Sequence, residues 1–184
     1  MWNKLFLLYF TTSLPENFFY CVKKKKRSYY MKNIIEKFYR DFENLDAESM
    51  VECYHQEIVF EDPAFGVLKG EKVKNMWRML CSSQKGIDFK IKTSNIEFEN
   101  QKGKAHWEAF YIFSKTGRKV HNIINAEFEF KDGKIVKHFD QFNLYKWSRQ
   151  ALGFKGLLLG WTSFFKKKLN AQTNKLLSKF EQNI

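Results

Sequence analysis

Residues 103–145 have the sequence GKAHWEAFYIFSKTGRKVHNIINAEFEFKDGKIVKHFDQFNLY, in which three strand-like segments can be recognised, 103–114, 118–131 and 134–145. In each segment aromatic and β-branched residues alternate with polar ones. Lys-Thr-Gly joins the first two segments and Lys-Asp-Gly the last two, and Asp-Gly between alternating strands is a strong hairpin signal. Strands of this length twist and curl. The stretch therefore predicts a curved antiparallel sheet with a concave face that other elements must cover.

Helices are predicted on the N-terminal side of these strands. Apolar residues at helical spacing predict one helix over 33–45 and a second that begins after Asp46, a favourable N-cap. A third helix is predicted over 71–84, with Trp77 on its inner face. In a further strand-like segment, 88–100, the apolar positions change parity midway, which predicts a bulge.

The net charge of +12 is concentrated at the two ends of the chain. Residues 1–30 and residues 155–184 each carry a net charge of +5, whereas residues 31–154 carry +2. A groove that binds nucleic acid needs Lys and Arg concentrated on one folded face. The nearly neutral centre therefore predicts that nucleic acid is not a partner.

Cysteine and histidine spacing gives no sign of a metal site. The three cysteines, Cys21, Cys53 and Cys81, lack the spacing of a metal site or a CxxC motif, and their odd number provides no disulfide framework. The four histidines share no ligand spacing either. The sequence predicts no metal, no cofactor, and free thiols in the reducing environment of the cytoplasm.

The chain is predicted to form one domain, residues 31–147, with a tail at each end. The apolar run 5–10 is too short for a secretory signal or a membrane span, and the basic run 23–27 follows it. We predict residues 1–30 to be a disordered extension that precedes a natural start at Met31. The alternatives are a peripheral membrane anchor and a nuclear address.

Residues 148–184 are predicted to be a C-terminal helical tail. Gly153 is expected to end a short helix, and the apolar run 154–165 is followed by the basic run 166–168. We expect this tail to close the mouth of the domain or to pack against a second subunit. Contact with a membrane surface through the basic tails is the less favoured alternative.

Asp62 is the first residue to which the sequence assigns chemistry. It ends the short strand predicted over 57–62, and Pro63 holds it in an extended conformation and removes one backbone donor. Burial of such a carboxyl raises its pKa and allows it to act as a base. The alternative is an ordinary Asp-Pro turn.

This order of helices, short strand and long meander resembles the nuclear transport factor 2-like superfamily, over about residues 33–146. The resemblance is closest to the SnoaL-like and ketosteroid isomerase branch, and its most specific motif is VFEDPAFG, residues 59–66. Ketosteroid isomerases have Glu-Asp-Pro-x-Gly here, and their catalytic base corresponds to Asp62. The resemblance implies an α+β fold in which a curved antiparallel or mixed sheet wraps around N-terminal helices as a cone. It also implies an apolar ligand in the cone and a homodimer.

The oxyanion-binding groups of ketosteroid isomerases have no counterpart in this sequence. Their Tyr corresponds to Phe38, with Tyr39 adjacent but about 100° further round the helix, and their Asp corresponds to Ala126. Steroid isomerisation by that mechanism is therefore not expected.

The last strand offers a different site. Alternation places His138, Asp140 and Phe142 on one face, which the resemblance suggests lines the cone, and SnoaL-like cyclases have an acidic residue corresponding to Asp140. His138 and Asp140 lie near enough for a hydrogen bond and are candidates for proton transfer, or else a structural pair. The predicted catalytic residues are Asp62, His138 and Asp140, and the predicted substrate-binding residues are Trp77, Trp107, Tyr111, Asn122 and Phe142.

Two hypotheses about function follow. The first is a pocket protein that acts as a cofactor-free isomerase, cyclase or hydrolase, by proton transfer on a small apolar molecule. The second is a non-catalytic module that binds a ligand or dimerises, and the missing oxyanion groups favour it. The sequence leaves both open.

Overall fold

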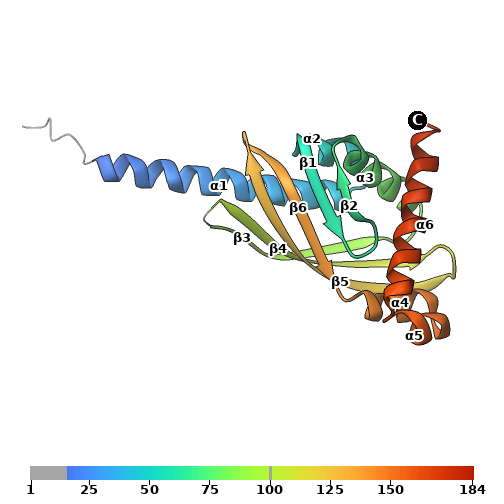
Figure 1. The fold of residues 1–184 in the computed structure, drawn as a ribbon. Helices are drawn as coiled ribbons and strands as arrows, with labels where there is room; N and C mark the ends of the chain where they lie inside the picture. Colours follow the sequence, from blue (N-terminus) through green and yellow to red (C-terminus); the bar gives the residue numbers. More distant parts are fainter. Residues whose placement is uncertain (1–15, 100) are drawn as a thin grey trace, which may run out of the picture.

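The computed structural model describes residues 16–184 except Asn100, and for residues 16–22 it describes the backbone alone (Figure 1). Six helices lie in this part of the chain: α1 (Glu16–Glu43), α2 (Ala47–Glu52), α3 (Glu71–Gln84), α4 (Leu144–Leu152), α5 (Phe154–Leu159) and α6 (Ser163–Glu181). The strands there are β1 (Tyr54–Asp62), β2 (Gly66–Lys69), β3 (Lys90–Glu99), β4 (Lys102–Phe113), β5 (Arg118–Lys131) and β6 (Lys134–Phe142).

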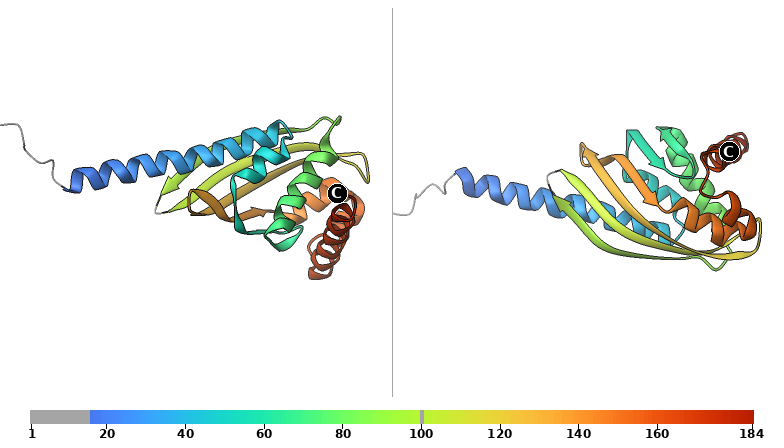
Figure 2. Two further views of the ribbon diagram at one scale, coloured as in Figure 1. Left: turned by 90° about the horizontal axis from the view of Figure 1, so that it is seen from above. Right: turned by 60° about the horizontal axis from the view of Figure 1, so that its bottom comes forward.

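The strands form one mixed sheet in the order β2-β1-β6-β5-β4-β3. Only β1 and β6 pair in parallel, and the other described neighbours are antiparallel. The sheet curves around the C-terminal half of α1, with α3 near one end of the concave side (Figure 2). The predicted α+β fold with a curved mixed sheet is therefore confirmed.

Large aromatic side chains fill the space between α1, α3 and the sheet. Phe38, Phe60, Trp77 and Phe128 are each at most 2% exposed. The ring of Phe38 lies edge-on to that of Trp77, with the centroids 5.3 Å apart. Burial of such rings is the main contribution to the stability of a core of this kind. These rings belong to one continuous core that packs against the sheet.

The predicted turns and helix ends agree closely with the structure. The side chain of Asp46 caps α2 by accepting a hydrogen bond from the backbone N–H of Ser49, and Gly153 ends α4. The register of β3 against β4 shifts between Ser94 and Glu97, where a bulge was predicted. Asn95 adopts a positive φ of 51° within that bulge.

Two predictions differ from the structure. No strand was predicted between the strand 57–62 and the helix 71–84, but β2 lies there, because Asp62 and Gly66 reverse the chain and return it along β1. Residues 16–30, predicted as part of a disordered extension, belong to α1, which projects beyond the sheet (Figure 1). Because Lys and Arg favour helices, α1 continues from its packed part back through the exposed basic run. Residues 1–15 lie outside the described part of the chain.

Candidate functional site

The structure contains a cavity of about 800 Å³. Its wall is formed by the concave face of the sheet, by α3, and by side chains from α4, α5 and α6. Most of the lining residues are apolar, and a volume of this size holds a drug-sized molecule. All five side chains predicted to bind substrate lie in this wall: Trp77, Trp107, Tyr111, Asn122 and Phe142.

Asp62 lies in the cavity wall at the end of β1. Its Oδ1 accepts hydrogen bonds from the backbone N–H groups of Ala64, at 3.0 Å, and Phe65. Loss of water around the carboxyl raises its pKa from 3.8 to about 7, and the negative charge of Asp140 contributes to the rise. The two backbone donors favour the carboxylate and oppose part of this rise. At neutral pH Asp62 is therefore present in both protonation states.

Asp140 lies in the same wall, on β6. Trp107 Nε1–H donates to its Oδ1 at 3.3 Å, and His138 Nε2 lies 3.0 Å from the same oxygen. The side chain is only 5% exposed. Two N–H groups directed at one oxygen stabilise negative charge there and fix the orientation of the carboxylate.

His138 connects Asp140 to Tyr54 in a buried chain of hydrogen bonds. Its Nδ1 lies 2.7 Å from the Tyr54 hydroxyl, and its Nε2 lies 3.0 Å from Asp140 Oδ1. A single tautomer satisfies both contacts: Tyr54 O–H donates to Nδ1, and Nε2–H donates to Asp140. The predicted hydrogen bond between His138 and Asp140 is therefore present.

His138 does not line the cavity, contrary to the prediction. Its side chain is fully buried, stacked against Trp77 with the ring centroids 6.0 Å apart. Phe38 and Phe60 meet it edge-on. Alternation predicted the correct face of β6 but not how deeply residue 138 is buried, since the aromatic side chains around it fill the space between the ring and the cavity. In this position the imidazole orients Asp140 and cannot touch a ligand in the cavity.

The positions that correspond to the oxyanion groups of ketosteroid isomerases contain no donor. Phe38 is part of the core, and Ala126 is the partner of Asp140 across the β5–β6 ladder. Tyr39 and Trp77 each have a buried polar atom, the hydroxyl and Nε1, with no hydrogen-bond partner among the described residues. Of these two residues only Trp77 lines the cavity.

Helix α6 contributes side chains to the cavity wall and is attached to the turn that follows Asp62. Asn170 Nδ2 donates to the carbonyl oxygens of Pro63 and Ala64, at 3.0 and 2.6 Å. Asn174 Nδ2 donates to the carbonyl of Phe65 at 2.8 Å. This attachment was not predicted, because residues 170 and 65 are far apart in sequence and Asn at these positions is unremarkable on a helix.

We predict that Asn170→Ala combined with Asn174→Ala will loosen α6 from the domain. The substitutions remove three side-chain hydrogen bonds to the turn, at about 1 kcal/mol each. Hydrogen exchange should become roughly tenfold or more faster in α6 and in the turn, with β4 and β5 unchanged. Ser178→Ala, at an exposed position of the same helix, is the control. Equal protection in the double variant and the control would contradict the role of these contacts.

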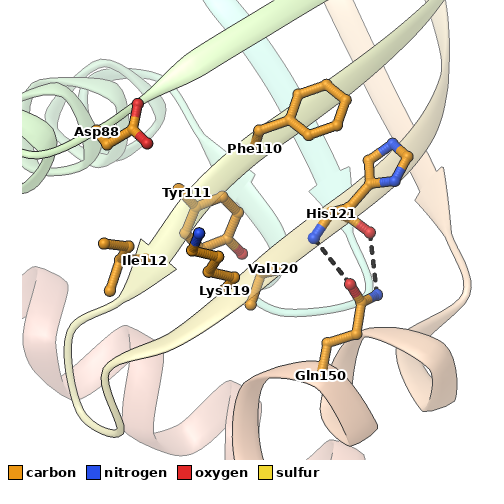
Figure 3. Close-up of a pocket in the computed structure, with 8 residues that line it drawn as sticks. All are labelled: Asp88, Phe110, Tyr111, Ile112, Lys119, Val120, His121 and Gln150. Atoms are coloured by element: carbon orange, nitrogen blue, oxygen red, sulfur yellow. Dashed lines mark hydrogen bonds between the residues drawn. The ribbon is translucent and has the colours of Figure 1, made fainter.

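A smaller hollow of about 230 Å³ lies on the outer face of the sheet (Figure 3). The side-chain amide of Gln150 pairs there with both backbone groups of His121, at 2.8 and 3.0 Å. His121 is not among the residues that line the large cavity, and its Nε2 contacts Glu108. These contacts attach α4 to β5, so the hollow is a structural junction.

Among the described residues, no three or more His, Cys, Asp or Glu side chains form a group that could hold a metal ion. The arrangement in the cavity is instead two carboxyl groups on one apolar wall. The pKa of Asp62 lies near neutral pH, and Asp140 is held in place by hydrogen bonds from Trp107 and His138.

Comparison with solved structures identifies the same fold at low sequence identity. An LEH-like epoxide hydrolase from M. tuberculosis is 21% identical, with a TM-score of 0.55, and the match covers 72% of this chain and 92% of that chain. TerC, co-crystallised with polyporic acid, is 11% identical, with a TM-score of 0.57 and coverages of 67% and 98%. A proposed polyketide cyclase from Xanthomonas campestris pv. campestris is 13% identical, with a TM-score of 0.56 and coverages of 68% and 98%.

A search of curated protein sequences found no match. The SnoaL-like domain model matches residues 35–138, more than half of the chain. The matched region runs from the packed half of α1 to the buried histidine of β6 and contains Asp62. The chain belongs to the SnoaL-like domain family.

Proposed function

We propose that this SnoaL-like pocket protein is an enzyme that transfers protons to and from a mostly apolar organic molecule. The observation that carries the proposal is that Asp62 and Asp140 line one cavity in different environments. Asp62 is desolvated, which brings its pKa to about 7. Asp140 receives two N–H groups on one oxygen. Carboxyl groups whose environments differ in this way commonly divide into an acid and a base.

In this proposal Asp140 is the base and protonated Asp62 is the acid. The sequence-based hypothesis gave Asp62 the role of base, but a pKa of about 7 leaves about half of it protonated at neutral pH. Asp140 would remove a proton from carbon or from a water molecule. Asp62 would deliver a proton to an oxygen of the ligand. His138 orients Asp140 from behind and is a positioning residue.

The lining of the cavity indicates the class of substrate. Trp77, Trp107 and Phe142 provide apolar contact area, while Asn122 and Tyr111 place polar groups in the wall. A ligand with a rigid hydrocarbon body and at least one ether, epoxide or carbonyl oxygen fits this lining. The fold neighbours include an epoxide hydrolase and a protein crystallised with polyporic acid, which supports an oxygenated organic substrate.

The test is turnover of apolar epoxides and of unsaturated ketones by the full chain and two variants. We expect Asp62→Asn and Asp140→Asn each to lower kcat by about 10²–10⁴-fold, with ligand binding retained. Native mass spectrometry of the purified chain would identify a bound molecule and narrow the panel of substrates. Asp88→Asn, an exposed carboxyl outside the cavity wall, is the control.

A non-catalytic ligand-binding module is the second candidate. The positions of the ketosteroid isomerase oxyanion groups hold Phe38 and Ala126, which supports it. Retention of a ligand that neither the native chain nor any variant converts would favour this candidate over the enzyme. The homodimer and the cytoplasmic location stay predictions.

A further inference from the structure

The corner formed by α5 and the first turn of α6 exposes large apolar side chains. Phe154 is 72% exposed, Leu158 55%, Trp161 73% and Phe164 66%. Single exposed apolar residues are ordinary, but a cluster within eleven consecutive residues marks an interaction surface. This corner lies at the opposite end of the molecule from the N-terminus of α1 (Figure 1).

The packing of α5 holds these side chains outward. A Cβ atom at Gly156 would lie 1.9 Å from the Ser148 carbonyl oxygen, and one at Gly160 would lie 1.8 Å from Ser148 Oγ. The two glycines therefore let α5 rest directly on α4, and Tyr145 donates a hydrogen bond to the Leu157 carbonyl at 3.2 Å. With its glycine face fixed against α4, the opposite face of α5 is presented to the surroundings.

Lysines accompany the apolar corner in the sequence. Lys155, Lys166, Lys167 and Lys168 are exposed, and within the described residues none of them forms an ion pair. Residues 154–180 contain no Asp or Glu. Nothing in this segment neutralises the positive charge, so a partner with negative charge is favoured.

A second copy of the chain fits this corner poorly. Two copies meeting through the corner about a two-fold axis would bring eight lysines together, and lysine is depleted in the cores of protein interfaces. No helix in the described residues has the length and apolarity to span a membrane. Aromatic and leucine side chains flanked by lysines are the composition of segments that lie in the interface of a bilayer.

We propose that this corner docks on an anionic membrane surface. Phe154, Leu158, Trp161 and Phe164 would enter the boundary between headgroups and acyl chains, and the lysines would contact lipid phosphates. Lys155 and Lys168 also line the cavity, so the docked corner borders the cavity. Docking would therefore place the cavity beside the bilayer, from which an apolar substrate can enter; this consequence rests on the proposed function.

Vesicle binding by the full chain tests the proposal. We expect the chain to co-sediment with vesicles of 70% phosphatidylcholine and 30% phosphatidylserine, and to bind pure phosphatidylcholine vesicles about tenfold or more weakly. Trp161→Ala with Phe164→Ala should weaken binding by about tenfold or more. Tyr29→Ala with Val67→Ala, at exposed apolar positions outside the corner, is the control and should bind like the native chain.

A second pair of variants separates the corner from the basic run of α1. Lys166→Gln with Lys167→Gln should weaken binding about 25-fold, because each lysine near an anionic surface contributes about fivefold. Lys23→Gln with Lys24→Gln removes the same charge at the other end of the molecule and should have a much smaller effect.

Brominated lipids report directly on Trp161. Of the tryptophans in the described residues it alone is exposed, the others being at most 7% exposed. Brominated vesicles should therefore quench the fluorescence of the native chain more strongly than that of Trp161→Phe.

The proposal would be overturned by no binding to anionic vesicles, by equal binding of the Trp161→Ala, Phe164→Ala variant, or by a larger loss from the Lys23→Gln, Lys24→Gln pair. A native dimer that the corner variant converts to monomer would assign the corner to a second copy instead. Asp62→Asn and Asp140→Asn should bind vesicles normally, so failure of docking and failure of the enzyme proposal are distinguishable.

Discussion

Asp62→Asn is expected to stabilise the folded protein at pH 8 by about 2–4 kcal/mol. Burial raises the pKa of Asp62 to about 7, so the carboxylate is less stable in the folded state than in the unfolded chain. A rise from 3.8 to about 7 corresponds to about 4 kcal/mol, and the lower bound allows for water in the cavity. Asn keeps the oxygen that accepts from Ala64 and Phe65 and removes only the charge.

The sign of the pH dependence follows from proton linkage. Between pH 3.8 and about 7 the folded state binds more protons at Asp62 than the unfolded state does. The stability that the protonated group provides is complete below pH 3.8 and is lost as the pH rises to about 7. The advantage of the variant should therefore be absent near pH 4, grow toward pH 7 and then stay constant.

Urea unfolding at several pH values measures this difference. Asp88→Asn removes one exposed carboxyl and should show no comparable gain. A variant that is equally stable or less stable than the native chain at pH 8 would show that Asp62 is not desolvated. A gain in stability together with a loss of turnover would mark Asp62 as a group kept for function.

His138→Leu is expected to destabilise the protein by about 3–5 kcal/mol. The substitution removes a fully buried imidazole and takes one hydrogen bond from each of its two partners, Tyr54 and Asp140. The Tyr54 hydroxyl then has no acceptor, and Asp140 keeps only the Trp107 donor. An orphaned buried group costs about 1–3 kcal/mol, and a carboxylate costs more.

A double-mutant cycle in urea unfolding separates this network from simple packing. Tyr54→Phe should cost less in the His138→Leu background than in the native chain, because its hydroxyl has already lost its partner. His121→Leu, on the outer face, should cost less than about 1 kcal/mol, since its contact with Glu108 is partly exposed. Additive costs for residues 54 and 138 would contradict a coupled chain.

The fold could be predicted because its signals are local. The turns at Gly117 and Gly133, the N-cap at Asp46 and the bulge near Asn95 depend on residues within a few positions of each other. The basic run of α1 was misjudged as disordered. The high content of charged residues there suggested a solvated, unstructured segment. In the structure this segment is helical, because α1 continues into it from the packed residues further along the chain.

The candidate site was predicted in part, for a different reason. Alternation along β6 placed Asp140 correctly but could not give the depth of His138, which depends on the aromatic residues of α1 and α3. Tyr54 was missed because it reaches His138 from β1, and the parallel β1–β6 pairing joins segments about 80 residues apart. The attachment of α6 through Asn170 was missed because its partners are backbone carbonyls more than 100 residues away.

The measurement that tests the central claim most directly is a carbon-13 NMR titration of the aspartate carboxyl groups, assigned with Asp62→Asn and Asp140→Asn. The account predicts that Asp62 titrates with a pKa of about 7 and that this pKa falls in Asp140→Asn, where a nearby negative charge is gone. A pKa of Asp62 near 3.8, unchanged by Asp140→Asn, would contradict the claim that two coupled carboxyl groups share one desolvated cavity.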